Sequence, residues 1–122
     1  MFLFYSKTEE INQKDYDLVL RISKYVRNKE ELFNIFSSEL HFPSYFGGTW
    51  DSFYDCLCNL DYLNKSKILF LHEELPFKDS DTDRTIYLDI LLDVDTNVLE
   101  DNVYKITTAF PEKYRDLIGS KE

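Results

Sequence analysis

The residues of this chain with the greatest capacity for chemistry lie in one short stretch that holds His41, Asp51, Asp55 and Cys56. A histidine near a carboxylate can transfer protons, and a thiol can act as a nucleophile. The stretch has neither a strained nucleophile turn nor a glycine-rich phosphate cradle. We therefore expect no catalytic residues: His41 is a helix-end or loop residue, and Cys56 is a small buried thiol. A small hydrolase that uses His41 with Asp51 and Asp55 is the less favoured alternative.

The two carboxylates, Asp51 and Asp55, stand four residues apart, so a helix would point both to the same side. Acids placed in this way do not flank a glycosidic bond, and without further oxygen ligands they form only a weak cation site. We therefore expect neither a metal ion nor a cofactor. A helix start, where negative charge is favoured, would also explain Asp51. However, exposed Tyr45, Phe46 and Tyr54 beside the acids indicate a binding surface.

The acids belong to a helix that we expect over residues 49–60, after a loop marked by Pro43 and the Gly47-Gly48 pair. Thr49 is a suitable N-cap, and the apolar residues after it recur at helical spacing. The apolar stripe consists of Trp50, Phe53, Leu57 and Leu60. The acids fall about a third of a turn away from this stripe. We therefore expect the helix to bury one side and to present the acids on another.

The stretch from Pro43 to Leu57 resembles the signature segment of the barstar family, intracellular inhibitors of secreted microbial ribonucleases. The matching positions are Pro43, Tyr45, Phe46, Gly47, Thr49, Trp50, Asp51, Phe53, Tyr54, Asp55, Cys56 and Leu57. In that family the segment forms the face that plugs the nuclease active site. The resemblance implies that this chain is not an enzyme and that its partner is a basic ribonuclease-type toxin. The implied partner-binding residues are Tyr45, Phe46, Gly47, Gly48, Thr49, Trp50, Asp51, Tyr54 and Asp55.

The resemblance also implies roles for single residues. Asp55 would take the place of an RNA phosphate, where hydrogen bonds to charged partners are strong, and Asp51 would add charge at the rim. Tyr45 and Tyr54 would supply rigid contact area. An acid of the third helix would join the binding face, although no motif assigns it, and Tyr62 is a candidate for a further aromatic contact.

Two positions depart from the family pattern. Thr49 stands where the family commonly has Asn, and Gly48 where many members have a charged or polar residue. These departures do not change the interpretation as an inhibitor, and they affect only which nuclease would be its target. The alternative is a binding protein on the same scaffold whose partner is a non-ribonuclease toxin or a regulatory protein.

The whole chain is acidic, since 14 Lys and Arg against 23 Asp and Glu give a net charge of -9 over 122 residues. Recognition of nucleic acid or of an acidic membrane needs basic patches, so we expect neither as a partner. A basic macromolecule would be attracted by electrostatic steering, although acidity also serves solubility. We expect the free protein to be a monomer.

The cysteines and the start of the chain indicate where the protein resides. Cys56 and Cys58 would point to different faces of a helix, which disfavours a disulfide between them, and no second Cys/His pair completes a zinc site. Reduced thiols are typical of cytosolic proteins. The N-terminal run lacks a signal-peptide pattern, and no apolar run approaches the roughly 20 residues of a membrane span. We therefore expect the protein to stay in the cytoplasm.

The hydrophobic pattern predicts the strands of the sheet at residues 16–22, 68–71 and 103–110, and a short strand at residues 2–5 in a segment that we place outside the sheet. It predicts helices at residues 29–40, after an Asn28 N-cap, at 49–60, from the acidic segment 79–83 to Val94, and at 112–118. This order indicates an α/β domain of barstar-like fold, with a small three-stranded parallel sheet packed with helices. We expect one domain over residues 1–122, with a core at about 16–110, an N-terminal extension at 1–15 and a C-terminal tail at 111–122.

Two further groups of polar residues are expected to be structural. His72 follows an apolar strand, and we expect a hydrogen-bonded histidine at the strand end. The third helix carries Asp81, Asp83, Asp89, Asp93 and Asp95. We expect these acids to form a solvated helix face and a cap.

Overall fold

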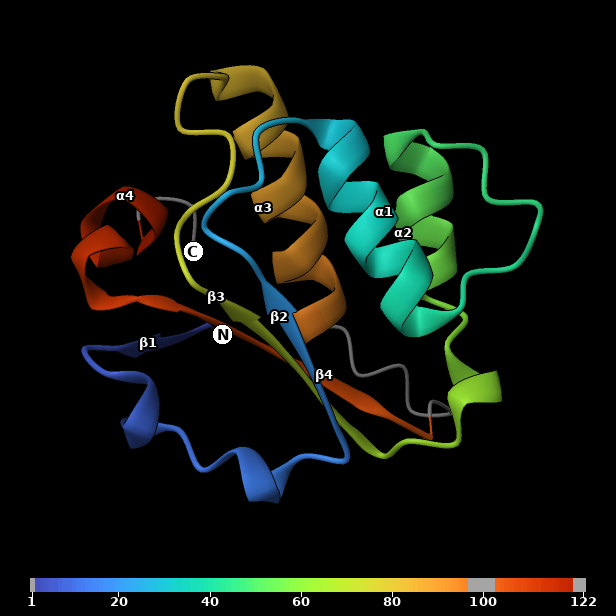
Figure 1. Ribbon diagram of the computed structural model, residues 1–122, viewed down its shortest axis with the longest axis horizontal. Coiled ribbons are helices and arrows are strands. Elements are labelled where there is room, and N and C mark those ends of the chain that lie inside the picture. The colour runs from blue at the N-terminus through green and yellow to red at the C-terminus, as the bar shows by residue number, and fades with distance from the viewer. Residues whose placement is uncertain (1, 97–102, 120–122) are drawn as a thin grey trace.

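In the part of the chain that the structure describes, residues 2–96 and 103–119, four parallel strands form one sheet (Figure 1). This computed structural model has the strand order β1-β4-β3-β2. The strands are β1 (Leu3–Tyr5), β2 (Leu18–Ile22), β3 (Lys67–His72) and β4 (Lys105–Pro111). The α-helices are α1 (Lys29–Leu40), α2 (Trp50–Leu57), α3 (Asp81–Thr96) and α4 (Arg115–Gly119). Short 3-10 helices lie at Thr8–Glu10 (η1), Gln13–Asp15 (η2), Asp61–Leu63 (η3) and Glu112–Tyr114 (η4).

The sheet is parallel, as predicted, but it has four strands rather than three because the N-terminal run joins it. In β1, Tyr5 pairs with Pro111 at the end of β4. The Tyr5 side chain is buried, and its hydroxyl donates a hydrogen bond to the carbonyl oxygen of His72. Residues that we expected to lie in an extension and a tail outside the core therefore take part in the sheet.

Most other elements are found within a few residues of their predicted positions. α1 begins after Asn28, whose Oδ1 accepts a hydrogen bond from the Glu31 N–H at 2.9 Å, as expected of an N-cap. The predicted terminal helix is divided into η4 and the short α4. No described helix is long and apolar enough to cross a membrane.

Three helices, α1, α2 and α3, pack on one face of the sheet through an aromatic core (Figure 1). Phe36 of α1, Phe53 of α2 and Phe70 of β3 are fully buried. The Phe36 ring lies edge-on to the other two, with ring centroids 4.9 Å and 5.0 Å apart. Such edge-to-face pairs are favourable beyond their burial, so Phe36 of α1 links α2 to the sheet.

The segment between β1 and β2 covers the opposite face of the sheet (Figure 1). Leu69 and Leu71 of β3 are buried on this face, where Ile11 and Tyr16 of the covering segment pack against the cluster. β3 is therefore buried on both sides, as its continuous apolar run predicts.

His72 ends β3 within the core and has hydrogen-bond partners on both ring nitrogens, as expected. Its Nε2 lies 2.6 Å from the Tyr87 hydroxyl, and its Nδ1 lies 3.1 Å from the Ala109 carbonyl oxygen. Burial lowers the pKa of His72 to about 3, so the folded protein holds this imidazole neutral at neutral pH.

Candidate functional site

The loop before α2 sets where this helix begins. Gly48 has a φ of +71°, in the left-handed region that favours glycine, whereas Gly47 lies outside that region. Thr49 is the N-cap: its Oγ1 accepts from the Ser52 N–H at 3.1 Å, and the Ser52 hydroxyl accepts from the Thr49 N–H at 3.2 Å. This reciprocal capping box fixes the first turn, which contains Asp51.

One side of α2 faces the core. Trp50 is half-buried, with its ring centroid 5.0 Å from that of Phe33, and its indole N–H donates to Asp83 of α3 at 3.3 Å. Phe46, which we expected to be exposed, is also half-buried, since its ring packs edge-on against Phe33 and Phe42. Of the predicted binding residues, Phe46 and Trp50 therefore support the surface from beneath.

The other side of α2 forms a surface that we call the α2 acidic face, consisting of Tyr45, Asp51, Tyr54 and Asp55. Asp51 and Asp55 are exposed, about one helical turn apart. Tyr45 and Tyr54 are 61% and 38% exposed, so both aromatic rings are accessible to a partner. Partial desolvation, followed by the charges of Cys56 and Asp55, raises the pKa of Tyr45, so this tyrosine lies near Asp55.

Side-chain hydrogen bonds join α2 to α3. The Tyr54 hydroxyl donates to the Asp93 carboxylate, and this bond raises the pKa of Tyr54. Together with the bond between Trp50 and Asp83, it gives α2 two polar attachments to α3. The acids of α3 are therefore not simply a solvated face. Asp95 departs furthest from that prediction, because it is buried and accepts from the Thr108 N–H at 3.3 Å.

The helix ends three residues before its predicted end at Leu60. The buried Tyr104 hydroxyl donates to the Leu57 carbonyl oxygen at 2.8 Å and accepts from the Leu60 N–H at 3.3 Å. The Asn59 amide also donates to the Asp55 carbonyl oxygen at 2.7 Å. The helix propensity of residues near Leu57 did not predict that α2 ends there, because Tyr104 lies far along the chain.

Tyr62, which the sequence left as a candidate contact, is 47% exposed in η3. Its hydroxyl donates to the Leu40 carbonyl oxygen at the end of α1, at 2.7 Å. Desolvation is the main cause that raises the pKa of Tyr62, and the charge of Tyr45 makes a smaller contribution. The two tyrosines therefore lie near each other.

His41 and Cys56, the histidine and the thiol considered for catalysis, occupy structural positions. His41 is an exposed residue in the left-handed conformation that ends α1. Cys56 is 1% exposed, and burial followed by the Asp55 charge raises its pKa, which favours the protonated thiol. Within residues 2–96 and 103–119, no three His, Cys, Asp or Glu side chains come together as a metal site.

Comparison with known proteins gives one match. The family model described as Barstar (barnase inhibitor) matches residues 18–108, a range that contains the loop before α2 and the whole α2 acidic face. Neither the curated proteins nor the solved structures give a match. The matched range begins at the start of β2 and ends within β4, so β1 and α4 lie outside it.

Proposed function

The chain belongs to the barstar family, and we propose that it blocks the active site of a basic microbial ribonuclease by presenting α2 carboxylates in place of RNA phosphates. The observation that carries this proposal is the position of Asp51 and Asp55, exposed one turn apart on a helix whose other side is buried. Neither side chain forms an ion pair within the described residues. Both charges are thus available to a cationic partner.

The partner in this proposal is a nuclease whose cleft binds phosphate with Arg, Lys and His side chains. A carboxylate that enters such a cleft forms charge-assisted hydrogen bonds with groups that are already arranged for an anion. We assign Asp55 to the phosphate site and Asp51 to its rim. Tyr45 and Tyr54 would contribute rigid contact area around the acids, as aromatic anchors do at other interfaces.

The attachment of α2 supports this mechanism. The Thr49 cap and the bonds from Trp50 and Tyr54 to α3 hold the helix before any partner arrives. A binding surface that is already ordered loses less conformational entropy on association. We propose that the free protein is a monomer that catalyses no reaction itself.

The test is a titration of a panel of basic, barnase-type ribonucleases with the purified protein. We expect loss of RNA cleavage at a one-to-one ratio for at least one nuclease, and no cleavage by the protein alone. The double variant Asp51→Asn/Asp55→Asn should lose this inhibition. A matched control, Glu30→Gln/Glu39→Gln, removes two exposed charges from α1 and should retain it. Equal inhibition by both double variants, or inhibition of no nuclease, would overturn the proposal.

A further inference from the structure

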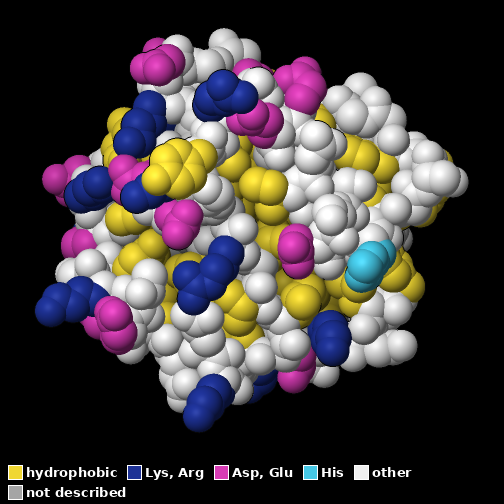
Figure 2. Space-filling view, in the orientation of Figure 1, with side chains coloured by type: hydrophobic (Ala, Val, Ile, Leu, Met, Phe, Trp, Pro, Cys, Tyr) yellow, Lys and Arg dark blue, Asp and Glu magenta, His cyan; other side chains and the backbone are white. Residues whose placement is uncertain are grey.

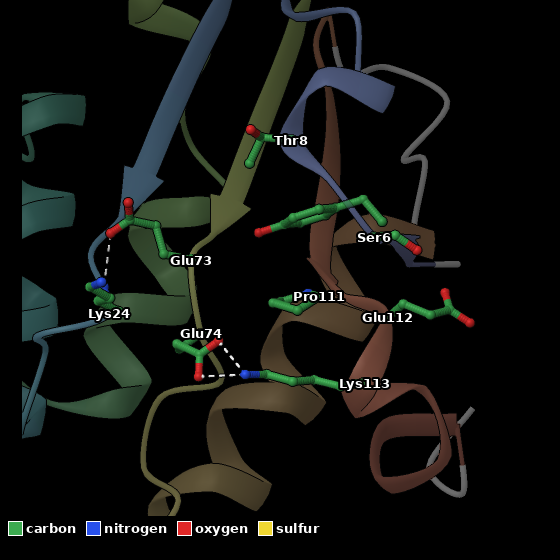
Figure 3. A pocket seen from close by; sticks show the side chains of 9 residues that line it. Ser6, Thr8, Lys24, Glu73, Glu74, Pro111, Glu112 and Lys113 are labelled. Atoms are coloured by element: carbon green, nitrogen blue, oxygen red, sulfur yellow. Dashed lines mark hydrogen bonds and ion pairs between the residues drawn. The ribbon is translucent and has the colours of Figure 1, made fainter.

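A hollow of about 710 Å³ opens at the carboxyl end of the sheet (Figure 3). Its walls include Tyr5 and Ser6 at the end of β1, Thr8 of η1, and Glu73 and Glu74 after β3. Lys113 closes one side by reaching across to Glu74 (Figure 3). This volume lies within the range of small-molecule sites, about 300–1,000 Å³.

The hollow lies where the chain changes from one face of the sheet to the other. After β1 the chain passes to the face that Ile11 and Tyr16 cover, whereas after β3 it enters α3 on the opposite face (Figure 1). Open α/β sheets bind their ligands outside the carboxyl ends of the strands at such a switch point. The position alone therefore makes this hollow a candidate site.

The hollow is separate from the α2 acidic face. Tyr5, Ser6 and Thr8 precede the residues that match the barstar family, and Lys113 follows them. The segments that this chain adds to the matched range thus build much of the wall. Inhibition of a nuclease by α2 leaves this feature unexplained.

Two of the three carboxylates around the hollow are already neutralised. Glu74 accepts from Lys113 and Lys78, each at 3.0 Å. Partial burial opposes ionisation of Glu74, but hydrogen bonds from Lys113, Lys78 and Tyr114 lower its pKa to about 2. Glu112 is likewise paired, with Arg115, at 2.7 Å.

The third carboxylate, Glu73, has no cationic partner among the described residues. Its Oε1 accepts only from the Lys24 backbone N–H, at 3.0 Å. The Lys24 ammonium instead lies over the Tyr25 ring, 5.3 Å from its centroid. Desolvation, followed by the charges of Glu73 and Glu74, raises the Tyr5 pKa, so the Tyr5 hydroxyl lies within reach of these two carboxylates.

We propose that this hollow binds a small ligand that carries a primary ammonium group, with the ammonium at the Glu73 carboxylate. The ammonium would be the cationic partner of Glu73, whereas Glu74 and Glu112 already have cationic partners in the protein. The Ser6 and Thr8 hydroxyls can accept further hydrogen bonds, and the Tyr5 and Pro111 rings provide apolar wall for a short carbon chain. The same group could come from a free amine or from a lysine side chain, and the experiment distinguishes these sources.

The experiment uses putrescine as the probe, followed by amide chemical shifts and calorimetry. We expect saturable one-to-one binding, with shifts centred on Tyr5, Thr8 and Glu73. Glu73→Gln keeps an acceptor for the Lys24 N–H and removes the charge, so it should weaken binding roughly tenfold or more. The control Glu39→Gln removes the same charge from an exposed site on α1 and should leave binding within about twofold of the parent.

A second variant, Thr8→Phe, fills the hollow without changing its charge and should also abolish binding.

A peptide with a single lysine and a blocked N-terminus replaces putrescine in a parallel titration. Tighter binding of that peptide would assign the ammonium to a protein partner. Both Glu73→Gln and Thr8→Phe should inhibit the ribonuclease as the parent does, so failure at this site is distinguishable from failure of the proposed function. Non-saturable binding, equal weakening by Glu73→Gln and Glu39→Gln, or binding of inorganic phosphate instead would overturn the proposal.

Discussion

Asp51 and Asp55 carry the same charge on successive turns of α2, yet we expect their substitution to have different effects. Asp55→Ala should leave cationic groups of the nuclease buried and unpaired. We expect this to cost about 2 kcal/mol or more in binding free energy, mainly as faster dissociation. The general range of hot-spot losses that we use already includes the barnase–barstar pair. Asp51→Ala should cost less and mainly slow association. Binding kinetics of both variants provide the measurement.

Both variants should fold, because neither side chain is buried, and circular dichroism is the control for this expectation. A folded Asp55→Ala variant that binds as tightly as the parent would show that α2 does not enter the active site. A larger loss of binding free energy for Asp51→Ala than for Asp55→Ala would instead mean that Asp51 is the central acid and Asp55 the peripheral one.

His72 should make the stability of the fold depend on pH. Its pKa is about 3 in the folded protein, against an ordinary value of 6.5. Between these values the unfolded chain binds a proton that the folded protein does not, so the free energy of unfolding should decrease as the pH falls from about 6.5 toward 3. The expected loss from pH 7 to pH 5 is about 2 kcal/mol, at about 1.4 kcal/mol for each pH unit below 6.5.

Urea unfolding at pH 7 and pH 5 measures this effect above the range in which most carboxylates titrate. The double variant His72→Phe/Tyr87→Phe removes both partners of the buried hydrogen bond and should flatten the dependence. His41→Gln, at an exposed position, should preserve it. An unchanged pH dependence in the double variant would contradict the assignment to His72.

At the scale of the elements, a distant hydroxyl holds the residues at the end of α2. Tyr104→Phe removes the bonds to the Leu57 carbonyl and the Leu60 N–H and leaves two buried backbone groups without this partner. We expect a loss of about 1–3 kcal/mol in the free energy of unfolding, measured by chemical denaturation. Tyr25→Phe, at a side chain that is 74% exposed, is the matched control and should change little. Equal stability of the two variants would mean that water replaces the Tyr104 hydroxyl.

The elements that the sequence predicts well are those whose causes are local. The Asn28 cap, the Gly48 turn and the Thr49 cap each act within a few residues, and the apolar run of β3 reflects burial on both faces. The α2 acidic face was largely predictable for the same reason, because helical spacing places Asp51 and Asp55 together.

The features that the sequence did not predict depend on residues far apart in the chain. β1 joins the sheet through pairing with β4, and a three-residue run contains too little pattern to predict a partner. Asp95 is buried because it meets the Thr108 N–H, and Tyr104 ends α2 from beyond α3. Phe46 is covered because Phe33 and Phe42 lie beside it. Periodicity reports which side of an element is apolar, but not which residue of another element will cover it.

At the scale of the whole molecule, the net charge of -9 is unevenly distributed. α2 and α3 carry aspartates and a single basic residue, Arg84. In Figure 2, many Lys and Arg side chains are seen near α4 and over the lower part of the molecule, where the strands and the segment between β1 and β2 lie, interspersed with acids. The layer that contains the α2 acidic face is therefore the more negative part of the described molecule, and a basic partner would be oriented toward it during approach.

This distribution leads to a prediction about association with the nuclease. Raising the salt concentration from 0.1 M to 1 M shortens the Debye length from about 10 Å to about 3 Å, so long-range attraction toward α2 and α3 should largely disappear. We expect the association rate to fall steeply while the dissociation rate changes less, because contacts that are buried in the complex are poorly screened. Stopped-flow kinetics over this salt range, for the parent and for Asp51→Asn, provide the measurement. The variant has one charge fewer on the approaching face, so its association rate should decline less steeply with salt. Association that is independent of salt in the parent would mean that the acidity of this chain serves its solubility and does not guide its partner.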